Sequence, residues 1–226
     1  MKVTFLGHSC FSLESDRNRI IIDPFLTGNP HAGAKSEDIM ADFVLLTHGH
    51  GDHIGDGIEI ALKNNATIIA PFELATYCQN KGAEAHAMHI GGSCEFPFGK
   101  VTLTIAHHGS GLPVDENIIY LGNPCGFVVR MDTKNIYHAG DTSVFYDMKL
   151  IGELYPLDLA LLPIGDNFTM GIIEALKAVE LLAPKAVIPM HYNTFDLIKK
   201  DPKDFISGLP ENVEGIILST GESYEL

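Results

Sequence analysis

The segment Thr47-His-Gly-His-Gly-Asp-His53 concentrates the side chains of this sequence that are best suited to chemistry. Within six residues it holds three imidazoles and one carboxylate: His48, His50, His53 and Asp52. Alternate side chains of an extended loop point the same way, so His48 and His50 can share one ion. Asp52 and His53 then turn toward a neighbouring site. Imidazole nitrogens and carboxylate oxygens at this density suit zinc or another first-row transition metal, so the segment predicts metal-assisted chemistry.

Further His and Asp residues follow other apolar runs of the sequence. The runs 43–46, 101–105, 135–137 and 186–190 each end in a loop that contains such residues. In sheets that are covered on both faces, strand ends are rigid platforms from which loops project ligands into one crevice. We therefore expect these four loops to meet and to form one site.

The elements that must position these loops predict a mixed α/β chain. Additional strands are expected at 3–6, 10–13, 19–22, 67–70 and 158–162, and a strand pair at 126–131 and 135–137. Helices are expected after His53 to about Asn64, from Pro71, and to Leu182 from an N-cap at Thr169. A final helix and hairpin follow Met190. Because no low-complexity linker divides the sequence, we expect one domain over residues 1–226.

Composition excludes several classes of protein. Fifteen Lys and Arg against 29 Asp and Glu give a net charge of −14, which argues against nucleic acid as the main partner and excludes a polybasic membrane-surface protein. A small anion attracted by bound metal ions is still compatible with this charge. The four cysteines lie far apart and predict reduced thiols. Without a signal peptide or a long apolar run, the expected location is the cytoplasm, with no membrane partner.

These motifs together resemble a known family. The segment 47–53 resembles the signature of the metallo-β-lactamase superfamily, and later motifs agree in type and order: Ala106-His-His-Gly-Ser110, His138-Ala-Gly-Asp-Thr142 and Pro189-Met-His191. Three others are similar to its small stand-alone branch of metal-dependent hydrolases, which includes relatives of ascorbate-6-phosphate lactonase: Gly7-His-Ser9, Ile22-Asp-Pro-Phe25 and the segment 163–171. The resemblance spans nearly the whole chain and implies a four-layer αββα sandwich.

The resemblance also implies a binuclear metal centre. The first ion would be held by three histidines: His48, His50 and one of the pair His107 and His108. The second would be held by Asp52, His53 and His191, with Asp141 bridging both ions. The branch usually places its ligand just before a small residue and Ser, and strand alternation points His107 to the opposite face, so His108 is favoured. The two divalent ions would be zinc by default, with manganese, nickel or iron possible at the same ligands.

The implied activity is hydrolysis of a small ester, lactone or phosphoester by a hydroxide that two metal ions activate. The catalytic candidates are Asp52 and Asp141, which offset part of the metal charge, and His8, which can donate a proton to substrate or leaving group. A satisfied core histidine is an equal interpretation of His8. Asp23 is a candidate acceptor for a ligand imidazole, against the alternative of a turn residue before Pro24.

Other residues and functions remain open at this point. His138 is expected to be structural or to support a ligand, and Tyr192 and Asn193 to be possible substrate contacts. A nucleic-acid phosphodiesterase is disfavoured by the charge, and a non-catalytic metal-binding sensor by the complete ligand set. Substrate choice is assigned to the loops 25–40, 107–118 and 163–170, which hold no Lys or Arg cluster for a phosphate. The expected partner is a small-molecule substrate, and the oligomeric state is not readable.

Overall fold

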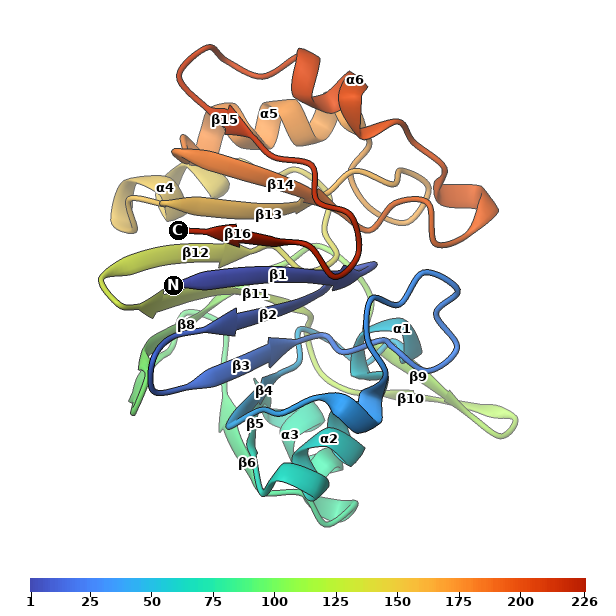
Figure 1. Ribbon diagram of the computed structural model, residues 1–226. Coiled ribbons are helices and arrows are strands. Elements are labelled where there is room, and N and C mark those ends of the chain that lie inside the picture. The colour runs from blue at the N-terminus through green and yellow to red at the C-terminus, as the bar shows by residue number, and fades with distance from the viewer.

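Two seven-stranded β-sheets lie face to face in the computed structural model, which describes residues 1–226 (Figure 1). The first sheet has the strand order β16 (Ser223–Glu225), β1 (Lys2–Gly7), β2 (Cys10–Glu14), β3 (Arg19–Ile22), β4 (Phe43–Leu45), β5 (Thr67–Pro71) and β6 (Ala85–Met88). The second has the order β15 (Glu214–Gly215), β14 (Ala186–Met190), β13 (Leu159–Pro163), β12 (Lys134–His138), β11 (Cys125–Met131), β8 (Gly99–Ile105) and β7 (Ser93–Phe96). A separate hairpin of β9 (Gly111–Val114) and β10 (Asn117–Tyr120) projects from the body.

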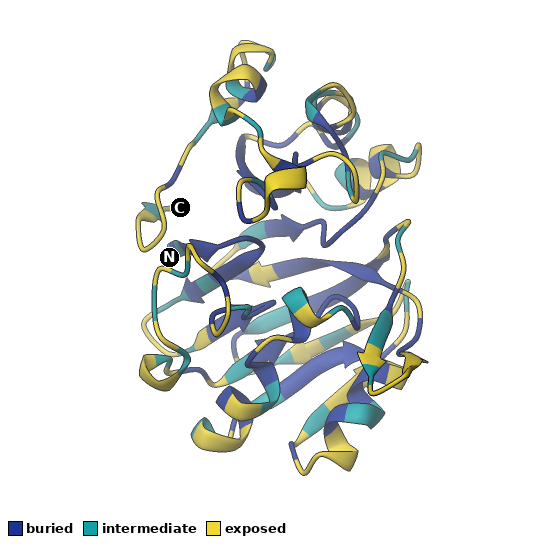
Figure 2. Ribbon diagram, turned by 90° about the vertical axis from the view of Figure 1, so that its right-hand side faces the viewer, coloured by how far each residue is buried: buried dark blue, intermediate teal, exposed yellow.

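Helices cover the outer face of each sheet. On the first sheet lie α2 (Gly57–Asn64) and α3 (Phe72–Asn80), and on the second α4 (Met148–Leu154), α5 (Ile172–Leu182) and α6 (Pro202–Ser207), whereas the short α1 (Gly51–Ile54) lies at the strand ends of the first sheet. Two 3₁₀ turns lie at Ser36–Asp38 and Asp196–Ile198. Figure 2 shows that buried residues follow the strands and that exposed residues gather on the helices and loops. The expected four-layer αββα sandwich is confirmed.

Burial on both faces explains the continuous apolar strands. In β3, Ile20 and Ile22 belong to a core cluster of 40 buried residues that joins the two sheets. Ile21 points the other way, into a cluster of 18 buried residues beneath α2 and α3. Alternate residues of a strand face opposite sides of the sheet, so a strand with helices on one side and a second sheet on the other must be apolar throughout.

The strands that precede the chemistry-bearing loops end at one edge of each sheet. In the first sheet β1 and β3 are both antiparallel to β2, and β4 is parallel to β3, so β1 and β4 run in the same direction. In the second sheet β8 and β12 are both antiparallel to β11, and β13 and β14 continue parallel to β12. The loops that follow β1, β4, β8, β12 and β14 therefore project from the carboxyl ends of strands that run the same way within each sheet.

The predicted terminal hairpin is wrong. β15 is parallel to β14 in the second sheet, whereas β16 is antiparallel to β1 in the first. The chain thus returns from one sheet to the other, and Val3 pairs with Tyr224 at the first sheet's edge.

No helix has both the length and the apolar character that crossing a membrane requires.

Two helices of the structure differ from their predictions, one in its continuity and the other in where it begins. The helix after His53 is interrupted at Gly55, whose φ of +42° and close approach to the Pro24 carbonyl exclude a side chain there. The second, α5, begins at Ile172, so Thr169 is not its N-cap. The preceding residues instead form a loop in which the Met170 N–H donates to the Thr142 carbonyl, next to Asp141.

Candidate metal centre

The loops after β1, β4, β8, β12 and β14 bring together most of the side chains that the sequence singles out. Their ligand atoms form three overlapping groups, each within 4.8 Å: His48, His50 and His108; His8, Asp52, His53 and His191; and His48, His53 and Asp141. All seven predicted metal ligands are included, and His8 joins them. The side chains from the two sheets therefore meet in one cluster.

The first group consists of three imidazole nitrogens that face one another. His50 Nδ1 lies 2.9 Å from His48 Nε2 and 3.2 Å from His108 Nε2. The Thr47 hydroxyl sets the tautomer of His48: it donates to Asp23 over 2.6 Å and so accepts from His48 Nδ1 over 2.9 Å. Nε2 of His48 then carries a lone pair directed at the group. Burial lowers the pKa of His48, which keeps the ring in the neutral form that binds a cation.

Asp23 fixes a second imidazole directly. His53 Nδ1 donates to its carboxylate over 2.7 Å, and the Thr47 N–H donates to the same carboxylate over 2.8 Å. The expected hydrogen bond between Asp23 and a candidate ligand imidazole is therefore present, and whether that imidazole binds a metal stays a prediction. Burial opposes a charge on His53, but Asp141 and Asp23 on either side raise its pKa. A cation at Nε2 would take the place of that proton.

Asp141 lies between the two groups. Its Oδ2 is 3.5 Å from His108 Nε2 on one side and 3.0 Å from His191 Nε2 on the other, and its Oδ1 is 3.3 Å from His53 Nε2. Burial raises its pKa, but the charges of His191 and His53 outweigh burial and hold the pKa well below its usual range. The side chain is therefore a carboxylate that faces both groups.

Several of these buried atoms have no hydrogen-bond partner: His53 Nε2, Asp141 Oδ1 and both ring nitrogens of His191. An unpaired buried polar atom typically costs about 1–3 kcal/mol, so a cluster of them needs another partner. Imidazoles and carboxylates that converge in this way are the donor set of a zinc or related transition-metal site. The residues present thus fit a metal centre.

His8 is connected to this cluster by a short chain of hydrogen bonds. Its Nε2 lies 3.2 Å from Asp52 Oδ2 and its Nδ1 lies 2.8 Å from the Thr194 hydroxyl. Burial lowers the pKa of His8 to about 4, so the ring is neutral at pH 7 and has one N–H. Burial raises the pKa of Asp52, but the hydrogen bond from His8 and the charge of His53 outweigh burial and lower it, so Asp52 is a carboxylate. The single N–H of His8 is therefore at Nε2 and donates to Asp52. Nδ1 then accepts from the Thr194 hydroxyl.

The two adjacent histidines after β8 have different surroundings. His108 faces His50 and Asp141, whereas His107 is exposed and its ring packs 5.0 Å from that of Phe145. The Ser110 hydroxyl accepts from the Gly49 N–H over 2.9 Å and so ties this loop to the loop after β4. Of the pair, the structure brings only His108 into the cluster.

His138 is structural. It is buried, and its Nε2 donates to the Ser9 carbonyl over 2.9 Å while its Nδ1 accepts from the Gly140 N–H. Ser9 follows β1 and Gly140 follows β12, so this ring connects the loops of the two sheets behind the cluster.

A cavity of about 340 Å³ opens over the cluster. Its floor is polar and its wall is apolar, with eight lining residues: His50, Asp52, His108, Asp141, His191, Phe168, Phe195 and Leu197. The expected substrate contacts Tyr192 and Asn193 are not among them. Asn193 Oδ1 instead accepts from the Lys200 N–H over 2.9 Å and shapes the loop.

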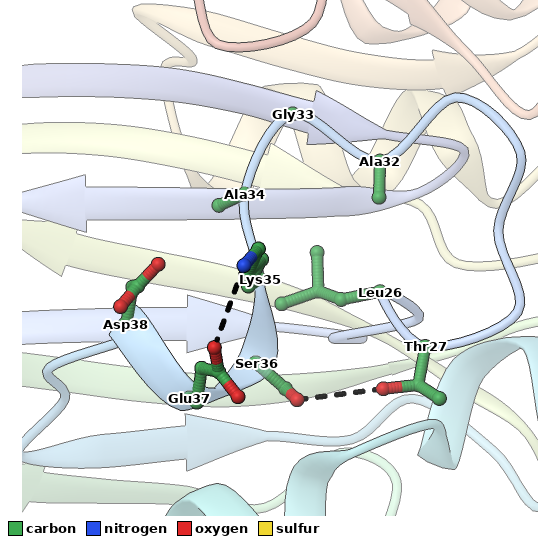
Figure 3. Close-up of a pocket in the computed structure, with 9 residues that line it drawn as sticks. All are labelled: Leu26, Thr27, Ala32, Gly33, Ala34, Lys35, Ser36, Glu37 and Asp38. Carbon is green, nitrogen blue, oxygen red and sulfur yellow. Dashed lines mark hydrogen bonds and ion pairs between the residues drawn. The ribbon is translucent and has the colours of Figure 1, made fainter.

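A larger hollow of about 590 Å³ lies elsewhere, beneath residues 26–38 (Figure 3). It contains the pair of Lys35 and Glu37 at 3.6 Å and none of the clustered histidines. This part of the predicted substrate loop 25–40 therefore does not line the cavity over the cluster.

Sequence reasoning missed Thr47, Thr194, Phe195 and Leu197. Short hydroxyl side chains such as Thr47 give no signal until their partners are placed, and Thr194 meets His8 across 186 residues of sequence. The proximity of Thr194 and Phe195 to the motif at His191 is the only signal that the sequence offers for them.

Comparisons with known proteins agree with this arrangement. Residues 2–191 match the family model described as a Beta-lactamase superfamily domain. The chain is 57% identical over 229 residues to a UPF0173 metal-dependent hydrolase of Pelotomaculum thermopropionicum and 56% identical over 227 residues to one of Geobacillus sp. strain WCH70, with both chains covered completely in each case. Among solved structures, Igni18, a metallo hydrolase from the archaeon Ignicoccus hospitalis, is similar with a TM-score of 0.90 and 38% identity, covering 100% of this chain and 98% of Igni18.

The family match spans most of the chain, and the relatives align with it from end to end. The cluster of imidazoles and carboxylates occupies the carboxyl edge of the two sheets, where loops from both meet. The chain therefore belongs to the metallo-β-lactamase superfamily and is one of its stand-alone metal-dependent hydrolases.

Proposed function

We propose that this hydrolase is binuclear and acts on a small ester, lactone or phosphoester. The observation that carries the proposal is the position of Asp141, whose carboxylate faces His108 at 3.5 Å on one side and His191 at 3.0 Å on the other. One ion would be held by His48, His50 and His108, the other by Asp52, His53 and His191, with Asp141 shared. Since these ligands come from both sheets, we propose that residues 1–226 act as one domain.

The chemistry proposed is metal-assisted hydrolysis. Two divalent ions in such a site lower the pKa of water toward neutrality and polarise the carbonyl or phosphoryl oxygen under attack. Asp52 and Asp141 would act catalytically by offsetting part of the metal charge. The imidazole and carboxylate donors suit zinc best, and also manganese, nickel or iron.

His8 is proposed as the proton donor of the site. Its single N–H points to Asp52 at the floor of the cavity, and Thr194 supplies a hydroxyl proton on the opposite side of the ring. A neutral imidazole could release its Nε2 proton while Nδ1 takes the proton of the Thr194 hydroxyl, and Thr194 would regain a proton from the water that is split. This path leads toward the floor, where the leaving group would lie.

Metal content tests the proposal. Elemental analysis of protein purified without chelator or affinity metal should give about two first-row transition ions per chain. Asp141→Asn should weaken the binding of both ions, because this one carboxylate would be a ligand of both. As a control, Asp158→Asn changes a buried carboxylate outside the cluster and should retain two ions. Near-zero metal after reconstitution at neutral pH, or two tight ions in Asp141→Asn, would contradict the binuclear assignment.

A further inference from the structure

We propose that the part of the substrate remote from the reacting bond is a small, uncharged apolar group that lies against Phe168, Phe195 and Leu197. This inference rests on the proposed hydrolytic function and narrows its substrate class. It concerns the apolar wall, defined here as these three side chains, which lines the cavity over the cluster.

The apolar wall exposes hydrophobic surface next to a polar floor. Phe168 is 51% exposed, Phe195 40% and Leu197 68%. Single exposed hydrophobic residues are common on proteins, but three that line one cavity offer a surface on which an apolar group loses contact with water. Each methylene buried there is expected to tighten binding about fourfold.

Phe195 is held in place from behind. Its ring lies 5.6 Å from the ring of His8 and 6.4 Å from that of Phe25. Its loop is closed by two backbone hydrogen bonds, from the Asn193 N–H to the Ile198 carbonyl and from the Ile198 N–H to the Phe195 carbonyl. The aromatic surface is therefore formed before any substrate arrives, and little ordering is needed on binding.

An ion pair connects the two loops that supply the apolar wall. Lys200 Nζ lies 3.0 Å from Asp166 Oδ2, and these residues flank the loops of Phe195 and Phe168 respectively. Asp166 is in the left-handed region, with φ of +65°, and the Phe168 N–H donates to its carbonyl. The ion pair thus joins the two loops at the rim of the cavity.

The same ion pair engages Lys200, the lysine that follows the Phe195 loop, with a carboxylate of the protein. Lys200 is paired with Asp166, and Lys199 is paired with Asp196 at 2.7 Å. None of the eight lining residues is Lys or Arg. A phosphate or carboxylate at the remote end of a substrate would therefore lose water beside Phe and Leu side chains without gaining a partner. An apolar remote group gains contact at the same place.

Two metal-chelating probes that differ only at the remote end test this inference. Butyrohydroxamic acid ends in a methyl group, whereas the monohydroxamic acid of succinic acid ends in a carboxylate. Calorimetric titration of the metal-loaded protein should show butyrohydroxamic acid binding at least tenfold more tightly. Leu197→Ala and Phe195→Ala should each weaken it about fivefold and leave the succinic compound unchanged. Leu154→Ala, at a 60% exposed leucine that does not line the cavity, should change neither.

The outcomes separate the two proposals. Equal affinities for the two compounds, or equal losses in Leu197→Ala and Leu154→Ala, would overturn the apolar wall as a substrate surface and leave the metal centre intact. A protein that takes up no metal and binds neither compound would overturn the binuclear function, and this inference with it.

Discussion

At the scale of single residues, only the direction of the side chain distinguishes His107 from His108 as a candidate metal ligand. The two side chains are identical and adjacent, yet only the ring of His108 reaches the other nitrogens, at 3.2 Å from His50. If His108 is a ligand, His108→Ala should lower metal affinity at least tenfold, since loss of a residue that merely supports a ligand already costs about that much, while His107→Ala should leave it unchanged. Competition with a chromogenic chelator measures the metal affinity of each variant. Equal losses in the two variants would contradict the assignment.

Residue types and spacing predict the clustering of seven side chains well, but they do not predict what orients them. His8 and His191 both have left-handed backbone, with φ of +56° and +54°. Such a conformation costs a non-glycine residue about 1 kcal/mol or more and is not readable from the sequence. It turns both rings into the cluster, where their centroids are 4.0 Å apart. Thr194 and Phe195 are placed by the same turn, which explains why neither was anticipated.

At the scale of elements, Asp158 joins three strands of the second sheet at their starts. Its carboxylate accepts from the Asn135 N–H of β12 at 2.9 Å and from Lys185, just before β14, at 2.8 Å, while Leu159 begins β13. Asp158→Ala should lower the free energy of unfolding by about 2 kcal/mol, because two hydrogen bonds to a charged group are lost. Urea denaturation at pH 7 measures the loss. Glu153→Ala, at an exposed helical ion pair, should leave the stability unchanged.

The contribution of Asp158 should also depend on pH. Burial raises its pKa, but hydrogen bonds from Lys185 and the Asn135 amide outweigh burial and lower it. A carboxyl with a lowered folded-state pKa stabilises the fold fully above its unfolded pKa of about 3.9 and loses this contribution as the pH falls through the folded value. The difference between the wild type and Asp158→Ala should therefore shrink between pH 5 and pH 3. A difference that grows toward acid would contradict this assignment.

Strands that are apolar on both faces are predicted accurately because their composition follows from the two covering layers. The predicted strands at 19–22, 67–70 and 186–190 match β3, β5 and β14 within one residue. The terminal hairpin was wrong because strand pairing is a long-range property. β16 pairs with β1 across the whole length of the chain, and no local pattern distinguishes this pairing from a hairpin.

At the scale of the whole molecule, the candidate ligands are divided between the two sheets. His48, His50, Asp52 and His53 follow β4 of the first sheet, whereas His108, Asp141 and His191 follow strands of the second. An unfolded chain can present only the local segment 48–53 to a metal ion. The complete ligand set exists only when both sheets are packed, so bound metal should stabilise the packed state specifically.

Removal of metal should therefore lower the melting temperature. An ion present at a hundred times its dissociation constant adds about 2.7 kcal/mol to the free energy of unfolding. For a chain of this size such a change corresponds to about 5–10 °C. Scanning calorimetry before and after chelation measures the shift, and Asp141→Asn should show a much smaller one, because its carboxylate no longer joins ligands from the two sheets. An equal shift in the variant would mean that the stabilising ions bind elsewhere, and no shift in the wild type would mean that the sheets are held together by their apolar core alone.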